Sequence, residues 1–288
     1  MRSKIIAALL FLLLSPVVCA RETTAETKGA SFFSAHVSRI THQCVYDAKQ
    51  FGMTFKNTVA APVRWKPTDW LTAGAIGGLT TYLYQDKKND RKWFRFSRLN
   101  QKYGEYEVYP KTFFEKTYMR LLEYPISHIS FGIAGATVLG NIFDLLPLHH
   151  LSAELLQSIA MSTGLATFGN FILAERRPSE GGKMRYFSRN GHGISGHGTF
   201  YTSLSGPLNK YISRFDEDDS TLMLISKSFA KTLIYGIPLL LAYSRLRHES
   251  SLNYPSKQAH PSHHAWNVLL ALSLGYATGE FVALQNRW

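Results

Sequence analysis

The sequence predicts an all-α protein in which a bundle of six core helices follows one amphipathic helix. Long apolar stretches alternate with polar ones, whereas the alternating pattern of strands and the dipeptides of hairpin turns are scarce. Gly, Ala and Ser recur at spacings that let helices approach closely. With 288 residues, 45% of them hydrophobic, the chain can bury a sizeable core, which excludes disorder, collagen and coiled coil as global descriptions.

Residues 1–20 have the features of a secretory signal peptide, which is excluded from fold reasoning. Two basic residues precede an apolar run from Ile5 to Leu14, and Ala20 suits a cleavage site. We therefore expect an exported protein, either periplasmic or membrane-associated in the cell envelope. A lipoprotein anchored through Cys19 is the alternative, although Val18 is bulky where the processing enzyme usually meets a small residue.

Residues 21–65 are predicted to form an N-terminal amphipathic helix and a linker. From Phe33 to about Asn57, apolar residues recur every three or four positions. Such a helix packs on the main domain or lies on a membrane surface. Pro62 and Pro67 then interrupt the chain.

Residues 66–288 are predicted to form one helical domain with six apolar stretches: Leu71–Tyr84, Tyr124–Phe143, Leu155–Ala174, Ser195–Leu208, Leu222–Tyr243 and Ala265–Leu284. The second and third each have 20 residues without a formal charge, just enough to cross a bilayer. Of the others, Leu71–Tyr84 and Ser195–Leu208 are shorter, and Leu222–Tyr243 is interrupted by Lys227 and Lys231. The mean hydropathy of −0.11 is low for a protein with many membrane spans. A buried core and a lipid environment therefore explain the pattern about equally well.

The chain is basic, with 32 Lys and Arg against 20 Asp and Glu and a formal charge of +12. Removal of the two basic residues of the signal peptide leaves 12 − 2 = +10. This charge suits phosphate groups, anionic lipids or nucleic acid. The segment Asp86–Lys111 mixes basic and aromatic residues, as nucleic-acid sites do. Because an exported protein seldom meets nucleic acid, we expect a solvated loop or a lipid contact there and no nucleic-acid partner.

Three separated segments carry residues suited to phosphate chemistry. The first runs from Asn170 to Arg177 and Pro178 at the end of an apolar stretch. Residues 170 and 177 are seven apart, two turns of a predicted helix, so we expect them on one face. The guanidinium of Arg177 can grip an oxyanion with two parallel donors.

The second segment reads Gly191-His-Gly-Ile-Ser195-Gly196-His197. Glycines remove side chains where backbone must approach a ligand. Ser195 can cap a helix whose free N–H groups then face an anion. The pattern predicts a phosphate cradle that a histidine follows directly.

The third segment contains Ser244-Arg245 and, after a polar loop, His263 and Asn267. The last two are four residues apart, so on a helix Asn267 can orient the ring of His263. Together with His197, this segment gives two candidate catalytic histidines. One could attack phosphorus and the other could protonate the leaving oxygen.

In order and content these segments resemble the type 2 phosphatidic acid phosphatase superfamily, which includes bacterial acid phosphatases, lipid phosphatases and vanadium haloperoxidases. The matches are Arg177-Pro178, Ser195-Gly196-His197, Ser244-Arg245 and His263, with Gly275 eight residues after the family's aspartate position. The resemblance implies a helical phosphatase without metal or other cofactor, acting on a phosphomonoester or on a lipid or polyprenyl phosphate. It further implies that His263 is the nucleophile, that His197 is the general acid, and that the phosphoryl oxygens are held by Arg177, Arg245, Ser195 and the Gly196 amide.

Four departures from the family pattern matter. Asn170 stands at the position of the phosphate-binding lysine, Ile194 replaces a proline, and Asn267 replaces the aspartate that polarises the nucleophile. The gap between Arg245 and His263 holds 17 residues instead of about five. In serine proteases the same Asp-to-Asn change lowers turnover by about 10⁴. A catalytically impaired protein that binds anions or envelope partners is therefore the alternative function.

Other interpretations are weaker. His260 and His264 have the spacing of a zinc pair, but no glutamate follows His260 as in zinc proteases, so we expect no metal site. The acidic cluster Asp216–Asp219 lacks the glycine and spacing of a calcium loop, which favours a solvated turn. A haloperoxidase would need the same anion pocket, and the missing lysine weakens it equally.

Overall fold

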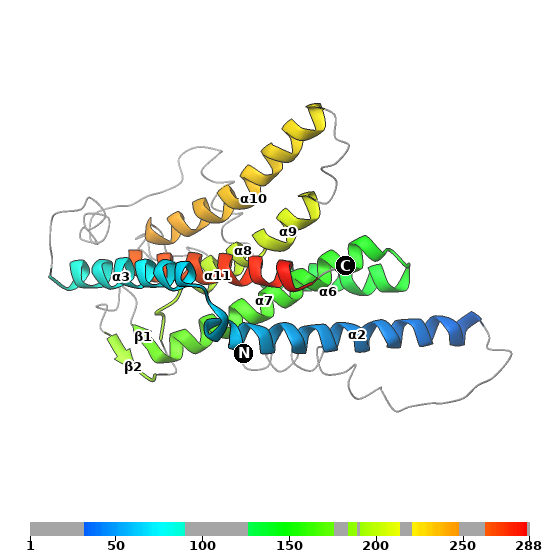
Figure 1. The fold of residues 1–288 in the computed structure, drawn as a ribbon, viewed down its shortest axis with the longest axis horizontal. Coiled ribbons are helices and arrows are strands. Elements are labelled where there is room, and N and C mark those ends of the chain that lie inside the picture. The colour runs from blue at the N-terminus through cyan, green and yellow to red at the C-terminus, as the bar shows by residue number, and fades with distance from the viewer. Residues whose placement is uncertain are drawn as a thin grey trace, which may run out of the picture.

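The computed structural model describes residues 32–89, 126–175, 184–188, 191–213, 221–247 and 263–286, and this part of the chain is mostly helical (Figure 1). The predicted all-α class is confirmed at this level. The elements are α2 (Phe32–Ala60), the short 3₁₀ helix η1 (Ala61–Arg64), α3 (Pro67–Asn89), α6 (Ile126–Ile142), α7 (Leu146–Ile172), β1 (Leu173–Glu175), β2 (Met184–Tyr186), α8 (Gly196–Ser203), α9 (Ser205–Ser213), α10 (Thr221–Arg247) and α11 (Ala265–Gln285). The signal peptide, most of the basic segment, Arg177, the acidic cluster and His260 lie outside the described residues.

Helix α11 lies at the centre of the molecule, where it packs against α3, α7, α8, α9 and α10 (Figure 1). Its contact with α8 and α9 depends on glycine. A Cβ on Gly275 would lie 1.8 Å from Oγ1 of Thr202, and one on Gly279 would lie 2.4 Å from the carbonyl oxygen of Ser203. A Cβ on Gly206 would lie 2.3 Å from the Gly279 carbonyl. No larger side chain fits at these positions, so the backbones meet directly.

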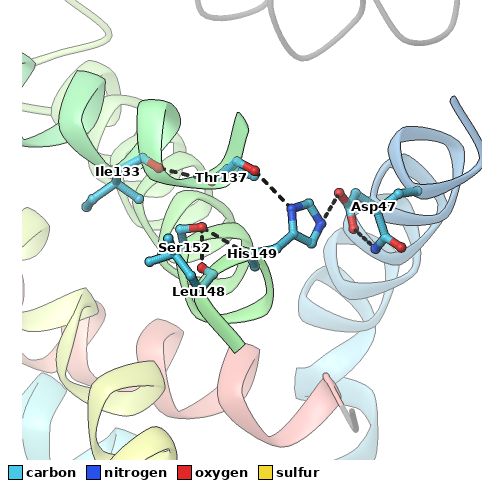
Figure 2. Close-up of polar contacts among 7 residues, drawn as sticks. Asp47, Ile133, Thr137, Leu148, His149 and Ser152 are labelled. Carbon is cyan, nitrogen blue, oxygen red and sulfur yellow. Dashed lines mark hydrogen bonds and ion pairs between the residues drawn. The ribbon is translucent and has the colours of Figure 1, made fainter. Parts of the chain in front are cut away.

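A buried histidine joins α2, α6 and α7. His149 is 1% exposed, and its Nδ1 lies 3.0 Å from the Thr137 carbonyl oxygen. Its Nε2 lies 3.0 Å from Oδ2 of Asp47, as Figure 2 shows. Burial lowers the pKa of His149, but the contacts with Asp47 and with the Thr137 carbonyl raise it more, so the net pKa is raised. Because both ring nitrogens face oxygen acceptors, the protonated ring satisfies both.

Two boundaries differ from the sequence prediction. The stretch predicted as one helix over 195–208 forms two helices, with Leu204 between them and Pro207 in the first turn of α9, where a proline is tolerated. The stretch predicted to stay helical to Ala174 leaves the helix at Ile172, because residues 173–175 pair antiparallel with Met184–Tyr186. The two-stranded pairing is nonlocal, so helical periodicity did not predict it.

Two described helices are long and apolar enough to cross a membrane, judged by length and composition: Thr221–Ala242 within α10 and Ala265–Gln285, which is α11. The stretches considered from sequence, Tyr124–Phe143 and Leu155–Ala174, are not among them. α6 has only 17 residues, and in α7 many of the buried residues are polar.

Candidate functional site

The glycine-rich loop, residues 191–195, leads into α8. Ser195 is fully buried and is the N-cap of α8, and its Oγ accepts a hydrogen bond from the Gly198 N–H at 3.3 Å. The predicted helix cap is therefore present. Gly196 is exposed at the first position of α8 with open space at its Cα, and His197 follows, half-buried.

Two glycines of this loop are required by contacts within the chain itself. A Cβ on Gly193 would lie 1.9 Å from the Leu173 carbonyl oxygen, and one on Gly191 would lie 2.3 Å from the Asn170 carbonyl oxygen. The loop thus packs directly on the end of α7 and on β1. Glycine at 191 and 193 is explained by contact with the chain's own backbone.

Asn170 fastens the loop. Its Nδ2 donates to the Ile194 carbonyl oxygen at 3.0 Å, and its Oδ1 accepts from the Ile194 N–H. Both ends of the amide are therefore used within the protein. In the structure Asn170 therefore positions the loop, and its contact with a phosphate stays a prediction. Moreover, α7 ends at Ile172, so residues 170 and 177 do not share a helix face as predicted.

The start of α11 carries the third segment. His264 is the N-cap and Asn267 is the third helical residue, so His263 precedes the helix. The predicted i, i+4 placement of His263 and Asn267 on one helix is therefore wrong. Asn267, 1% exposed, accepts from the His264 N–H at 2.8 Å and donates to the Gly193 carbonyl oxygen. This amide connects α11 to the glycine-rich loop.

Glu175 is a buried acidic residue that the sequence reasoning missed. It lies in β1, is 1% exposed, and accepts a hydrogen bond from Asn267 Nδ2 at 3.2 Å. Its other oxygen lies 3.9 Å from Nε2 of His264, and its backbone carbonyl accepts from the His192 N–H at 2.8 Å. The available signal was a lone acidic residue at the end of a long uncharged apolar stretch.

These contacts bring three distant segments together: residues 170–175, 191–197 and 263–267. His197 and His263 are each four residues along the chain from one partner of the bond between Gly193 and Asn267. Arg177 lies outside the described residues, and Arg245 lies in the last turn of α10 with its side chain outside the description. The cluster combines imidazole rings, a helix N-terminus and a buried carboxylate, which suits nucleophilic and acid-base chemistry.

No group of three or more His, Cys, Asp or Glu side chains within the described ranges is arranged to hold a metal ion. His260, one of the two residues considered for zinc, is outside those ranges. Comparisons of the chain with protein-family models, with curated proteins and with solved structures found no match in any of the three.

Proposed function

We propose that this chain is an exported phosphatase that hydrolyses a phosphomonoester or a lipid or polyprenyl phosphate through a phosphohistidine. The observation that carries the proposal is the bonding of Asn267 to both Gly193 and Glu175. It joins the start of α11, which His263 precedes, to the glycine-rich loop, which leads to His197 in the first turn of α8. The resemblance to type 2 phosphatidic acid phosphatases assigns the roles.

The reaction has two steps. A ring nitrogen of His263 attacks phosphorus, the bond from phosphorus to the ester oxygen breaks, and His197 gives its proton to that oxygen. His197 then takes a proton from water, and the hydroxide attacks the phosphohistidine, which breaks the P–N bond and releases phosphate. The Gly196 amide, Arg177 and Arg245 hold the phosphoryl oxygens.

Glu175 supplies a negative charge that Asn267 lacks. A buried carboxylate stabilises positive charge on imidazole rings in the same cluster. In this proposal the carboxylate comes from β1 and reaches the start of α11 through Asn267 and His264. The aspartate position of the family is therefore compensated by a residue from another segment.

The test is phosphate release by the mature protein from p-nitrophenyl phosphate, phosphatidic acid and a polyprenyl diphosphate. We expect His263→Ala to lower turnover by about 10³-fold or more. His128→Ala is the matched control, because His128 is exposed on α6, away from the cluster. An acid-labile phosphoryl label on the wild-type protein, absent in His263→Ala, identifies the intermediate. Equal activity of the wild type and His263→Ala would refute the proposal.

The second candidate function is a non-catalytic anion-binding protein, and the engagement of Asn170 with Ile194 favours it, because no charged group replaces the family lysine there. The discriminating variant restores the family residues, Asn170→Lys and Asn267→Asp, in a Glu175→Gln background that avoids two adjacent carboxylates. A large gain in turnover indicates an impaired native site. High activity of the native chain excludes this second function.

A further inference from the structure

The first turns of helix α10 expose apolar side chains in every direction, and the helix up to Leu240 exposes them on all sides but the one packed on the protein. Residues 221–226 are all exposed, and successive residues of a helix point about 100° apart, so together they face every direction. Farther along, Phe229 is 65% exposed and Leu240 56%. Only 11% of the most apolar 18-residue window within Thr221–Ala242 is buried, against 44% for the corresponding window of α11. A helix of a water-soluble protein normally keeps its apolar residues on one buried stripe.

The two lysines of α10 lie on the side that faces the protein. Lys227 is only 9% exposed and Lys231 is half-buried one turn later, and Pro238 and Ala242 continue this buried side. α10 packs here against α8, α9 and α11. The Ser205 hydroxyl donates to the Ile234 carbonyl oxygen at 3.0 Å. Charge inside and apolar side chains outside is the reverse of the arrangement that water favours.

The described chain as a whole shows the same inversion. With glycine and proline left aside, its buried residues comprise 19 polar or charged and 15 hydrophobic ones, so polar residues outnumber apolar ones in the interior. Large apolar side chains are exposed on α6 as well, among them Phe131, Val138 and Leu139. Exposed apolar patches of this extent mark a contact with a membrane or a partner.

The length of the apolar segment Thr221–Ala242 favours contact with a membrane over contact with a protein partner. Its 22 residues rise about 33 Å at about 1.5 Å per residue, which matches a hydrocarbon core of about 30 Å. The sequence is charged on both sides, with Asp216–Asp219 before the segment and Arg245 and Arg247 after it. A protein partner that docks on one face would leave the opposite face exposed, whereas lipid surrounds a helix.

We propose that α10 crosses a lipid bilayer, with the Lys227 side packed on the protein and the remaining circumference against acyl chains. The proposal is independent of the phosphatase reaction, because it concerns the surface of α10 alone. A catalytically inactive chain would insert in the same way.

The test measures what surrounds the two sides of α10. Leu224 and Phe229 are five residues apart, which places them about 140° apart around the helix. Each is replaced by Cys in a full-length chain in which Cys19 and Cys44 are Ser, then spin-labelled and placed in phosphatidylcholine and phosphatidylglycerol vesicles. Lys66→Cys is the control, because Lys66 is exposed just before α3.

We expect both α10 labels to be relaxed by oxygen, which enters hydrocarbon, more strongly than by a water-soluble nickel chelate, and the Lys66 label to show the reverse. Circular dichroism checks that each variant keeps its helix content, and either α10 label can be moved to Leu233 if a variant fails to fold. Equal access of the chelate to the α10 and Lys66 labels would overturn the proposal in favour of water. Protection of one or both α10 labels from both reagents would overturn it in favour of a protein partner.

Discussion

Replacing Asn267 by Asp should destabilise the fold at neutral pH, although it restores the residue of the resembling family. The new carboxylate would stand where Asn267 Nδ2 now donates to Glu175, 3.2 Å from an oxygen of that buried side chain. At an effective dielectric constant of about 20, two unit charges at 3.2 Å repel by about 5 kcal/mol. Binding of one proton by either of the two carboxylates relieves the repulsion. For a carboxyl group that ordinarily titrates near pH 4, binding this proton at pH 7 costs about 4 kcal/mol.

The pH dependence of the stability loss shows whether repulsion between the two carboxylates causes it. Above about pH 4 the folded variant binds one proton more than the unfolded chain, so its stability falls as pH rises. We expect a loss of about 4 kcal/mol at pH 7 and of about 1 kcal/mol at pH 5. Chemical unfolding followed by circular dichroism measures both, and adding Glu175→Gln should recover most of the loss. A variant as stable as the wild type at pH 7, or a loss that neither pH nor Glu175→Gln changes, would refute the reasoning.

Three further outcomes follow from other contacts. Burial lowers the pKa of His149, but its contacts, Asp47 chief among them, raise it above the usual value. The stabilisation of the fold by protonated His149 is therefore full below about pH 6.5 and is lost as pH rises through the folded-state pKa. Replacing Asp47 by Asn should lower the free energy of unfolding by about 1.5–3 kcal/mol near pH 6 and by much less at pH 8, as unfolding titrations would measure. The variant Gly275→Ala should lower Tm sharply, because its Cβ would overlap α8. Gly236→Ala is the control and should leave Tm unchanged or raise it, because there is open space at its Cα. Equal effects of the two variants on Tm would contradict the close packing of α8 and α11. Asn170→Lys should remove both bonds to the glycine-rich loop, cost about 1–3 kcal/mol and increase proteolysis within that loop; intact stability would argue against the positioning role.

The helical parts of the fold were predictable because their signals are local. Apolar periodicity predicted a helix from Phe33 to about Asn57, and the structure has one over Phe32–Ala60. The Ser195 cap was likewise readable from a serine followed by glycine and a helical pattern. The end of α7 was not, since Leu173, Ala174 and Glu175 are compatible with a helix until Met184–Tyr186 pairs with them.

The polar cluster could be predicted only in part for the same reason. The resemblance implied a single site built from three segments; residues 170–175, 191–197 and 263–267 are in contact, whereas Arg177 lies outside the described residues. The burial of Glu175 depends on its strand and on Asn267, a residue 92 positions away. The two lysines of α10 interrupt its apolar stretch in the sequence, and only the structure shows that Lys227 is buried while Phe229 and Leu240 are exposed.

The glycine contacts between α8 and α11 have a mechanical consequence. Gly275 packs against the Thr202 side chain and Gly279 against the Ser203 carbonyl oxygen so closely that the helices cannot shift past each other without steric overlap. The ends that precede them, near Ser195 and His264, are therefore carried on a single stiff unit. A relative movement of these two ends therefore requires the glycine contacts to separate.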